Sequence, residues 1–298
     1  MAMRKDFAMD GPVFDSAAKT AFAEAYPGNT CKLTHHLADE PLLTLDALAD
    51  LAGILPANSI EYNPGTLPIG IAPEDVPTSD LGVVETIRNI GETGSWVVLK
   101  RIEQVGAYAA LLEHILGELT DVVAPRTGEM MQHEGFIFVS SPGAVTPFHF
   151  DPEHNILLQL TGSKTMTLFS VEDEAISPPS VHEAFHLGEH HRNLTYREDF
   201  AEHGTALTIG PGEAIHVPVK APHWVQVGPE PSISLSITWR SEWSYAEADA
   251  RAFNRALRKL GLRPSSPRPF PSRNMGKALA WRAMSRANTM LKSRSATS

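Results

Sequence analysis

Residues 135–170 read GFIFVSSPGAVTPFHFDPEHNILLQLTGSKTMTLFS. Short runs rich in β-branched and aromatic residues alternate there with turn signals such as SPGA and TGSK. After an irregular, histidine-rich stretch from about residue 172 to 204, runs of the same kind resume and continue to residue 239. Many short strands at this spacing predict a β-sandwich or barrel.

The segments on either side of these strands predict helices. Residues 44–56, TLDALADLAGILP, offer Thr44 as an N-cap, regularly spaced leucines, and a stop at Gly53 and Pro56. Residues 102–123 place apolar side chains on one helical face, and residues 96–99 predict an early strand.

Two more helices are predicted at the C-terminal end, over about residues 244–260 and over residues 278–291, separated by the proline-rich RPSSPRPFPSR.

We therefore divide the chain into three parts. Residues 1–128 form a helical region that packs on the barrel, residues 129–243 form the barrel core, and residues 244–298 form a basic helical extension.

The bulk composition is that of an ordinary globular protein. Of the 298 residues, 42% are hydrophobic and 20% charged. No apolar run approaches 18 residues, so we expect no transmembrane helix. The N-terminal MAMRKDFAMDGP lacks the apolar region of a secretory signal. The single cysteine, Cys31, excludes an internal disulfide and any multi-cysteine metal site, and a cytoplasmic location fits best.

Charge is distributed unevenly along the chain. Residues 250–298 contain 12 Lys and Arg and no acidic residue, which leaves 13 basic against 35 acidic residues elsewhere. Such a tail could contact nucleic acid or another acidic partner. We favour the alternative that it packs on the acidic body of its own or a neighbouring subunit, because its apolar spacing suits a helix.

Two side chains in the quoted stretch could bind a metal together. Residues i and i+2 of a strand point to the same face, so His149 and Asp151 project together. The best third candidate is His223, which follows a proline-interrupted corner and opens another β-type run. Two histidines and one carboxylate on one face of a metal form the facial triad of non-haem Fe(II) oxygenases. The three open positions suit a bidentate 2-oxo acid and O₂.

A dicarboxylate bound at such a metal needs a cation for its far end. Lys164 in LTGSKTMTLF shares its strand face with apolar Met166 and Leu168. A lysine on an interior face is costly unless it meets an anion. The alternative is a lysine at a strand end that reaches out to water.

Six positions in this region resemble the jumonji C branch of the cupin superfamily, and most closely the group of the asparaginyl hydroxylase that acts on hypoxia-inducible factor. In that group a Thr precedes the first ligand His by three residues, an Asn follows it by six and a Lys by fifteen. A distal His lies five residues after the Pro of an IP-like strand end. The matching residues here are Thr146, His149, Asp151, Asn155, Lys164 and His223.

The resemblance implies a double-stranded β-helix, or jelly-roll cupin core, and an Fe(II)- and 2-oxoglutarate-dependent oxygenase. His149, Asp151 and His223 would bind iron. Lys164 and Thr146 would hold the distal carboxylate of 2-oxoglutarate. Asn155 would contact the co-substrate or steady the ligand strand. Family members often dimerise through C-terminal helices, which suggests a homodimer.

The sequence departs from that group at Thr238, where the asparaginyl hydroxylase has an Asn near the metal. A Thr offers only one donor, so asparagine hydroxylation is not carried over. Ser232, Ser234, Ser236 and Thr238 alternate with apolar residues along the last strand. We expect this polar face to line the site, the alternative being a solvated outer face.

A competing motif is HEAFH, residues 182–186, which matches the H-E-x-x-H pattern of zinc proteases. The extended form of that pattern fails, since the next glycine is Gly188 and position 192 is Arg. We expect a surface insertion with solvated His182, His186, His190 and His191 instead. We expect His154 and His216 to lie outside the ligand set.

The sequence therefore predicts an oxygenase that hydroxylates a protein side chain or a small molecule. The alternative is a cupin-fold metal-binding or regulatory protein without oxygenase activity. The substrate, and the choice between hydroxylation and demethylation, cannot be read from the sequence.

Overall fold

The computed structural model describes residues 11–64, 69, 71 and 82–295. Most of the N-terminal segment that we examined for a secretory signal lies outside the described residues. Within the described ranges, no helix combines the length and apolar character that crossing a membrane requires.

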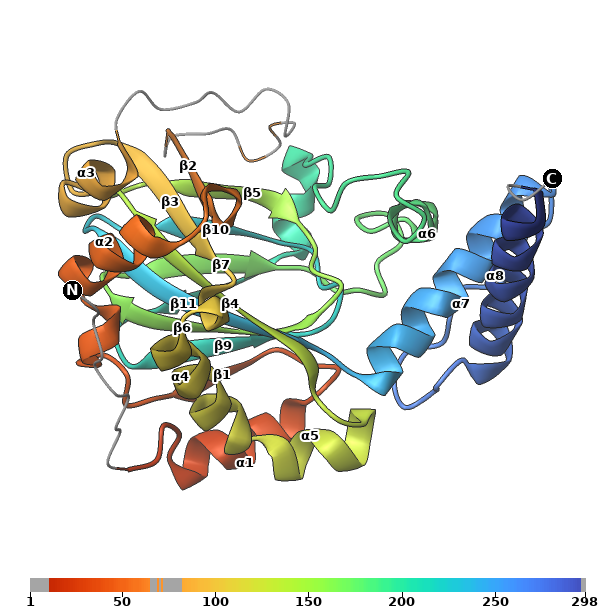
Figure 1. The fold of residues 1–298 in the computed structure, drawn as a ribbon, viewed down its shortest axis with the longest axis horizontal. Helices are drawn as coiled ribbons and strands as arrows, with labels where there is room; N and C mark the ends of the chain where they lie inside the picture. Colours follow the sequence, from red (N-terminus) through yellow and green to blue (C-terminus); the bar gives the residue numbers. More distant parts are fainter. Residues whose placement is uncertain (1–10, 65–68, 70, 72–81, 296–298) are drawn as a thin grey trace.

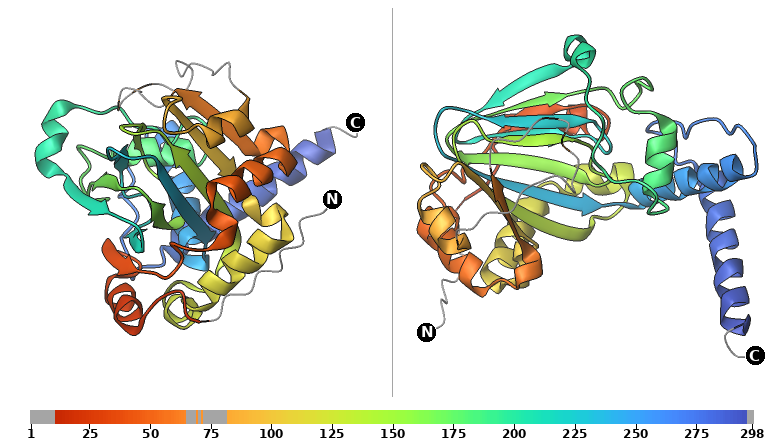
Figure 2. Two further views of the ribbon diagram at one scale, coloured as in Figure 1. Left: turned by 90° about the vertical axis from the view of Figure 1, so that its left-hand side faces the viewer. Right: turned by 90° about the horizontal axis from the view of Figure 1, so that it is seen from above.

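The core consists of two antiparallel β-sheets that face one another (Figures 1 and 2). The larger sheet has the strand order β1-β9-β6-β11-β4-β3-β2, and the smaller has the order β5-β10-β7-β8. The strands are β1 Cys31–Thr34, β2 Ile60–Pro64, β3 Ser95–Lys100, β4 Met131–Ser140, β5 Val145–His149, β6 His154–Thr161, β7 Lys164–Leu168, β8 Thr205–Ile209, β9 Glu213–Val217, β10 His223–Val227 and β11 Ser232–Arg240.

From β4 to β11 the chain passes back and forth between the two sheets. Strands β4, β6, β9 and β11 belong to the larger sheet, and β5, β7, β8 and β10 belong to the smaller one. Apolar side chains from both sheets, including Leu157, Met166 and Ile215, pack together between them. This arrangement confirms the predicted jelly-roll core.

Five helices lie in the N-terminal part that the structure describes: α1 Ser16–Ala25, α2 Leu45–Ile54, α3 Val83–Arg88, α4 Gly106–Gly117 and α5 Thr120–Thr127. Apolar residues of α1, α2 and α4 join Ile137, Leu158 and Leu235 of the larger sheet in the main hydrophobic core. These helices therefore cover the outer face of that sheet (Figure 1).

The predicted helix over residues 44–56 is confirmed, and the Thr44 hydroxyl accepts a hydrogen bond from the Ala47 amide at 3.4 Å. The single helix predicted over residues 102–123 is wrong. It is divided into α4 and α5, and α4 ends at Gly117, a residue with low helix propensity. The N-terminal region also contributes β1, β2 and β3 to the larger sheet, of which only β3 was predicted.

The C-terminal end carries two helices, as predicted: α7 Glu242–Lys259 and α8 Met275–Ser295. Helix α7 follows β11 directly, and Ser241 and Ser244 form a reciprocal capping box at its start. A shorter helix, α6 Pro179–Phe185, packs on α7. Helices α7 and α8 pack on one another beside the barrel, at the opposite end from α2 and α3 (Figure 1). The division of the chain at residues 128 and 243 stays a prediction.

Candidate metal centre

His149, Asp151 and His223 meet at one end of the smaller sheet. His149 ends β5 and His223 begins β10, and the two residues are paired in the antiparallel ladder. One ligand atom from each of the three side chains lies within 4.8 Å of the other two. The two Nε2 atoms lie 3.9 Å and 3.8 Å from the Asp151 oxygens, and all three residues are buried. The predicted third ligand is therefore brought to the predicted pair.

Backbone carbonyls fix the orientation of both imidazoles. The Nδ1 atom of His149 lies 2.7 Å from the Pro147 oxygen, and that of His223 lies 2.9 Å from the Ala221 oxygen. A carbonyl can only accept, so each Nδ1 carries the proton and each Nε2 offers its lone pair to the centre. Burial and the neighbouring His223 lower the pKa of His149, and burial lowers the pKa of His223. Both rings are therefore neutral near pH 7, the form that binds metal.

Two side chains hold the Asp151 carboxylate. Asn155 Nδ2 donates to Oδ2 at 3.2 Å, and Arg192 Nη1 donates to Oδ1 at 3.1 Å. Burial alone would raise the pKa of the Asp151 carboxyl. The lowering by His149, Arg192 and His223 outweighs that effect and brings the pKa to about 2. The carboxylate is therefore ionised at neutral pH. The donor set of two neutral imidazoles and one carboxylate fits a divalent metal of the non-haem iron type.

Arg192 was not among the predicted site residues. It belongs to the loop between α6 and β8, which runs along the free edge of β5. The Phe150 amide donates to the Arg192 carbonyl at 3.2 Å, and His149 forms an isolated bridge with Asn193. No local sequence pattern marks Arg192, because its position depends on where this loop docks.

A cavity of about 660 Å³ opens beside the three ligands. Its lining includes every site residue predicted from the sequence: Thr146, His149, Asp151, Asn155, Lys164, His223 and Thr238. The strand register orders them in depth. Leu168 of β7 pairs with His223, whereas Lys164 pairs with Val227. Lys164 therefore lies four residues along β7 from the level of His223, a distance of about 13 Å. Thr146 pairs with Val225, between these two levels.

Lys164 is a buried cation. Only 3% of its surface is exposed, so the alternative of a lysine that reaches out to water is wrong. Its Nζ donates to Ser234 Oγ at 2.6 Å and lies 5.2 Å from the centre of the Phe138 ring. Within the described ranges, no carboxylate forms an ion pair with it. Burial lowers the pKa of Lys164 to about 7, so an anion in the cavity would relieve a substantial electrostatic cost.

The polar face of β11 lines the interior. Every residue of this strand is buried, so the alternative of a solvated face is wrong. Ser236 Oγ donates to Asn155 Oδ1 at 2.8 Å, which leaves the Asn155 amide directed at Asp151. Asn155 therefore links β11 to the Asp151 carboxylate, and its role at the site stays a prediction. Thr238 pairs with Asn155 and lines the cavity beside the ligands.

Comparison with known proteins gives one sequence relative that bears on this site. Jumonji C domain-containing protein 5 of Drosophila melanogaster is 30% identical over 106 residues, which are 33% of this chain and 25% of that protein. The chain is similar to this jumonji C protein over that stretch. It spans about a quarter of the length of this curated relative. No protein-family model matches the chain.

Two solved structures are also similar to this chain. The X-ray structure of E. coli ycfD is 19% identical, with 89% of this chain and 66% of that chain covered and a TM-score of 0.49. Another is YcfD, titled a ribosomal oxygenase from Escherichia coli, in complex with cobalt and 2-oxoglutarate. It is 18% identical, with 92% of this chain and 68% of that chain covered and a TM-score of 0.49.

The HEAFH segment, residues 182–186, comprises the last four residues of the short helix α6 and the residue that follows it. The predicted solvated character is wrong for His182, which is buried, and for His186, which is half-buried, and it holds for the exposed His190 and His191. Glu183 of the same segment is also buried. Glu183 forms an ion pair with Arg258 of α7 at 2.6 Å, and His182 Nε2 contacts Ser177 Oγ. The only group of three or more potential ligands among the described residues is the triad.

His154 and His216 lie outside the ligand set, as expected. The His154 ring stacks on Trp239 at 5.3 Å, and its Nε2 lies 2.9 Å from Ser241 Oγ. The His216 ring lies edge-on to Phe22, and its Nδ1 lies 2.9 Å from the Asn29 carbonyl oxygen. Both are buried structural histidines.

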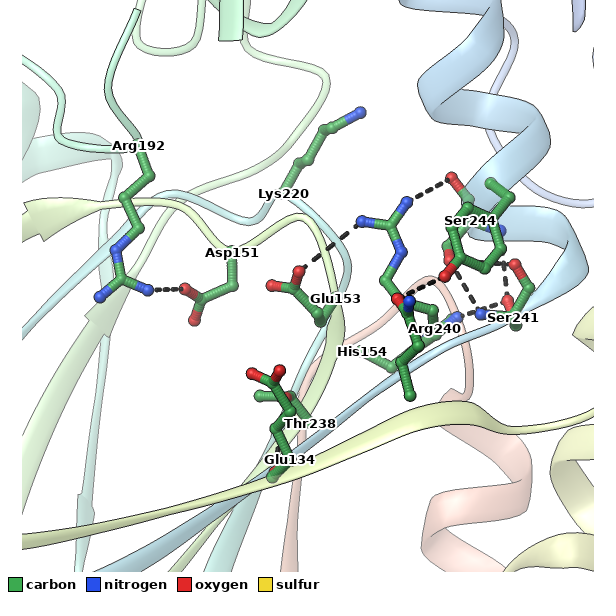
Figure 3. Close-up of polar contacts among 12 residues, drawn as sticks. Glu134, Asp151, Glu153, His154, Arg192, Lys220, Thr238, Arg240, Ser241 and Ser244 are labelled. Atoms are coloured by element: carbon green, nitrogen blue, oxygen red, sulfur yellow. Dashed lines mark hydrogen bonds and ion pairs between the residues drawn. The ribbon is translucent and has the colours of Figure 1, made fainter. Parts of the chain in front are cut away.

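Two carboxylates at the cavity wall were missed by the sequence reasoning. Figure 3 shows Glu153 and Glu134 with Asp151 between Arg192 and Arg240. Glu153 lies 3.7 Å from Arg240, and burial together with the Asp151 charge raises its pKa to about 7. Glu134 accepts a hydrogen bond on its backbone oxygen from Thr238 Oγ1 at 3.5 Å. These residues give the wall beside the ligands an acidic character.

Proposed function

We propose that this protein is an Fe(II)- and 2-oxoglutarate-dependent oxygenase. The observation that carries the proposal is the combination, in one cavity, of an oriented, buried triad and a buried lysine that forms no ion pair with the described residues. A metal site alone would fit many cupin proteins. A cation on the neighbouring strand β7, about 13 Å along the sheet from the level of His223, adds a specific requirement for an elongated ligand with a negative charge at its far end.

The dimensions suit a five-carbon 2-oxo diacid. Its 2-oxo and carboxylate oxygens would occupy two metal positions left open by His149, Asp151 and His223. Its distal carboxylate would meet Lys164, which lines the same cavity. Thr146 lies at an intermediate level and would donate to the same carboxylate. Met166 and Leu157, which also line the cavity, would pack on the methylene groups.

When bound, iron and 2-oxoglutarate together supply the activation of O₂. The overall reaction converts substrate, 2-oxoglutarate and O₂ into hydroxylated substrate, succinate and CO₂. The chain itself contributes three functions. It fixes the two imidazoles through Pro147 and Ala221, keeps Asp151 ionised, and excludes water from a site whose ligands are buried.

The test is co-substrate binding with a redox-inert metal. Isothermal titration of 2-oxoglutarate is performed on the protein loaded with Mn²⁺ and on the metal-free protein. We expect saturable binding only with metal, and a loss of at least about tenfold in affinity for Lys164→Met, which removes a buried charge-assisted hydrogen bond. Metal binding without 2-oxoglutarate binding would instead support the cupin-fold protein without oxygenase activity.

Several further expectations stay predictions. They are a protein or small-molecule substrate, a homodimer through the C-terminal helices, and a cytoplasmic location. Helix α8 exposes Met275, Leu279 and Met284, which is compatible with a contact between copies of the chain. Its basic residues would allow nucleic-acid contact, although Arg282 forms an ion pair with Asp249 of α7 at 2.6 Å. That ion pair supports packing of the basic tail on its own subunit.

A further inference from the structure

The turn between β9 and β10 contacts two of the three ligands. The Lys220 amide donates to the backbone oxygen of Asp151 at 2.7 Å. The next carbonyl, that of Ala221, accepts the Nδ1 proton of His223 at 2.9 Å. A hydrogen bond of 3.0 Å from the Ala221 amide to the Pro218 oxygen closes the turn. A shift of this turn would therefore move Asp151 and His223 together.

Lys220 adopts a backbone conformation that this turn requires and that lysine disfavours. Its φ is +65°, in the left-handed region where non-glycine residues are uncommon. An outlier of this kind persists only when the surrounding structure holds it in place. On the side of the turn that faces away from the ligands, the Lys220 side chain provides this restraint. Figure 3 shows that this side chain points away from Asp151.

The Lys220 side chain ends in an ion pair with Glu247 of α7. Lys220 is 2% exposed and Glu247 is 6% exposed, so the pair is shielded from water. The second oxygen of Glu247 accepts from Arg251, one turn further along the same helix. Glu247 is thus the anion that both cations share, and it links the middle of α7 to the turn that orients the ligands.

We propose that Glu247 is a positioning residue for the metal centre, which acts through Lys220 on the backbone of Asp151 and on the ring of His223. This inference rests on the proposed metal site. A buried ion pair adds little net stability but fixes geometry, and removing one partner leaves the other charge buried and uncompensated. Outer residues that orient metal ligands typically change metal affinity by about 10–100-fold when they are replaced.

The alternative is that the pair only holds α7 against the barrel. A second ion pair on the same helix, with a buried carboxylate and a partly exposed arginine, separates the two ideas. Arg258 of α7 pairs with the fully buried Glu183 of α6. Among the described residues, neither forms a hydrogen bond or an ion pair with the turn at residues 218–221. Glu183→Gln is therefore a matched control that weakens the attachment of α7 without touching the ligand turn.

The experiment is a titration with Co²⁺ followed by its visible d–d absorption, performed on the full chain. We expect Glu247→Gln to bind Co²⁺ about 10–100-fold more weakly than the wild type, with an altered absorption envelope. Glu183→Gln should bind within about twofold of the wild type. The double variant Lys220→Met/Glu247→Gln carries no unpaired buried lysine and should show the same loss of affinity as Glu247→Gln. The double variant also provides the test if Glu247→Gln alone fails to fold.

Wild-type affinity in folded Glu247→Gln, or in the folded double variant, would overturn the inference. An equal loss in Glu183→Gln would also overturn it, because the effect would then follow the attachment of α7 in general. Failure of the wild-type protein to bind Co²⁺ would refute the proposed metal site and the inference that rests on it. Binding by the wild type that is insensitive to Glu247 would leave the metal site in place and reject only the positioning role.

Discussion

Replacing Lys164 by Met should make the ligand-free protein more stable. Burial lowers the pKa of Lys164 from its ordinary value of 10.5 to about 7, which corresponds to about 5 kcal/mol against the fully charged form. At pH 7 that cost is about 4 kcal/mol, because half of the side chains have lost the proton. Met keeps most of the apolar stem but leaves the Ser234 hydroxyl without its partner, a loss of about 1–2 kcal/mol. We therefore expect a net gain of about 2–3 kcal/mol in the free energy of unfolding.

The stability difference between Lys164→Met and the wild type should depend on pH. Between pH 7 and 10.5 the unfolded chain holds a proton on Lys164 that the folded chain has released, so the stability of the wild type rises with pH across this window. The advantage of Lys164→Met should be largest at or below pH 7 and should disappear as the pH approaches 10.5. Added metal and 2-oxoglutarate should reverse the order, because only the wild type gains from the bound carboxylate.

The assay is denaturant unfolding of both proteins at several pH values, with and without Mn²⁺ and 2-oxoglutarate. Lys100→Met is the control, since Lys100 lines the same cavity but forms a partly exposed ion pair with Glu61. Its effect should stay below about 1 kcal/mol. Two results would refute the reasoning that Lys164 is a buried cation without a bound anion. One is a lower stability of Lys164→Met than of the wild type at pH 7, and the other is a gain in stability that does not change with pH.

Three further predictions concern Asn155, the turn between β6 and β7, and the core. Asn155→Ala should weaken Co²⁺ binding by about 10–100-fold, because Asp151 loses the amide that orients it; an unchanged titration curve would contradict this. Gly162→Ala should lower the free energy of unfolding by more than about 2 kcal/mol, since φ is +66° and the new Cβ would lie 2.3 Å from the Pro231 oxygen. The control Gly188→Ala, with similar φ but no neighbour within 4 Å, should cost clearly less in the same denaturation assay. Phe150→Ala should cost about 3–5 kcal/mol by the same assay, because this fully buried ring packs on His182 and Phe185; a loss below about 1 kcal/mol would contradict its place in the core.

Much of the site could be predicted because its geometry is local. Strand alternation predicted that His149 and Asp151 project together, and they do meet, although β5 ends at His149. Phe148 and Phe150 lie in a separate apolar cluster. The same alternation identified Lys164 as a cation on an interior face. His223 is far along the chain, and it was found through its place at a proline corner and through the family resemblance rather than through local periodicity.

The missed residues depend on how distant segments dock. Arg192 reaches Asp151 because its loop pairs with the edge of β5, a contact that no pattern in the loop specifies. Lys220 matters through a left-handed turn and a partner on α7, 27 residues further along the chain. The strands β1 and β2 join the larger sheet although their short segments carry weak β signals, because long-range pairing with β9 and β3 decides their conformation.

The most direct test of the account is visible absorption of the protein with Fe(II) and 2-oxoglutarate under anaerobic conditions. The account predicts a weak charge-transfer band that appears only when both are present. The band should be absent in His149→Ala, which lacks a ligand, and should require much higher 2-oxoglutarate concentrations in Lys164→Met. Iron bound by the triad without any such band at saturating 2-oxoglutarate would contradict the claim that the cavity holds this co-substrate between the metal and Lys164.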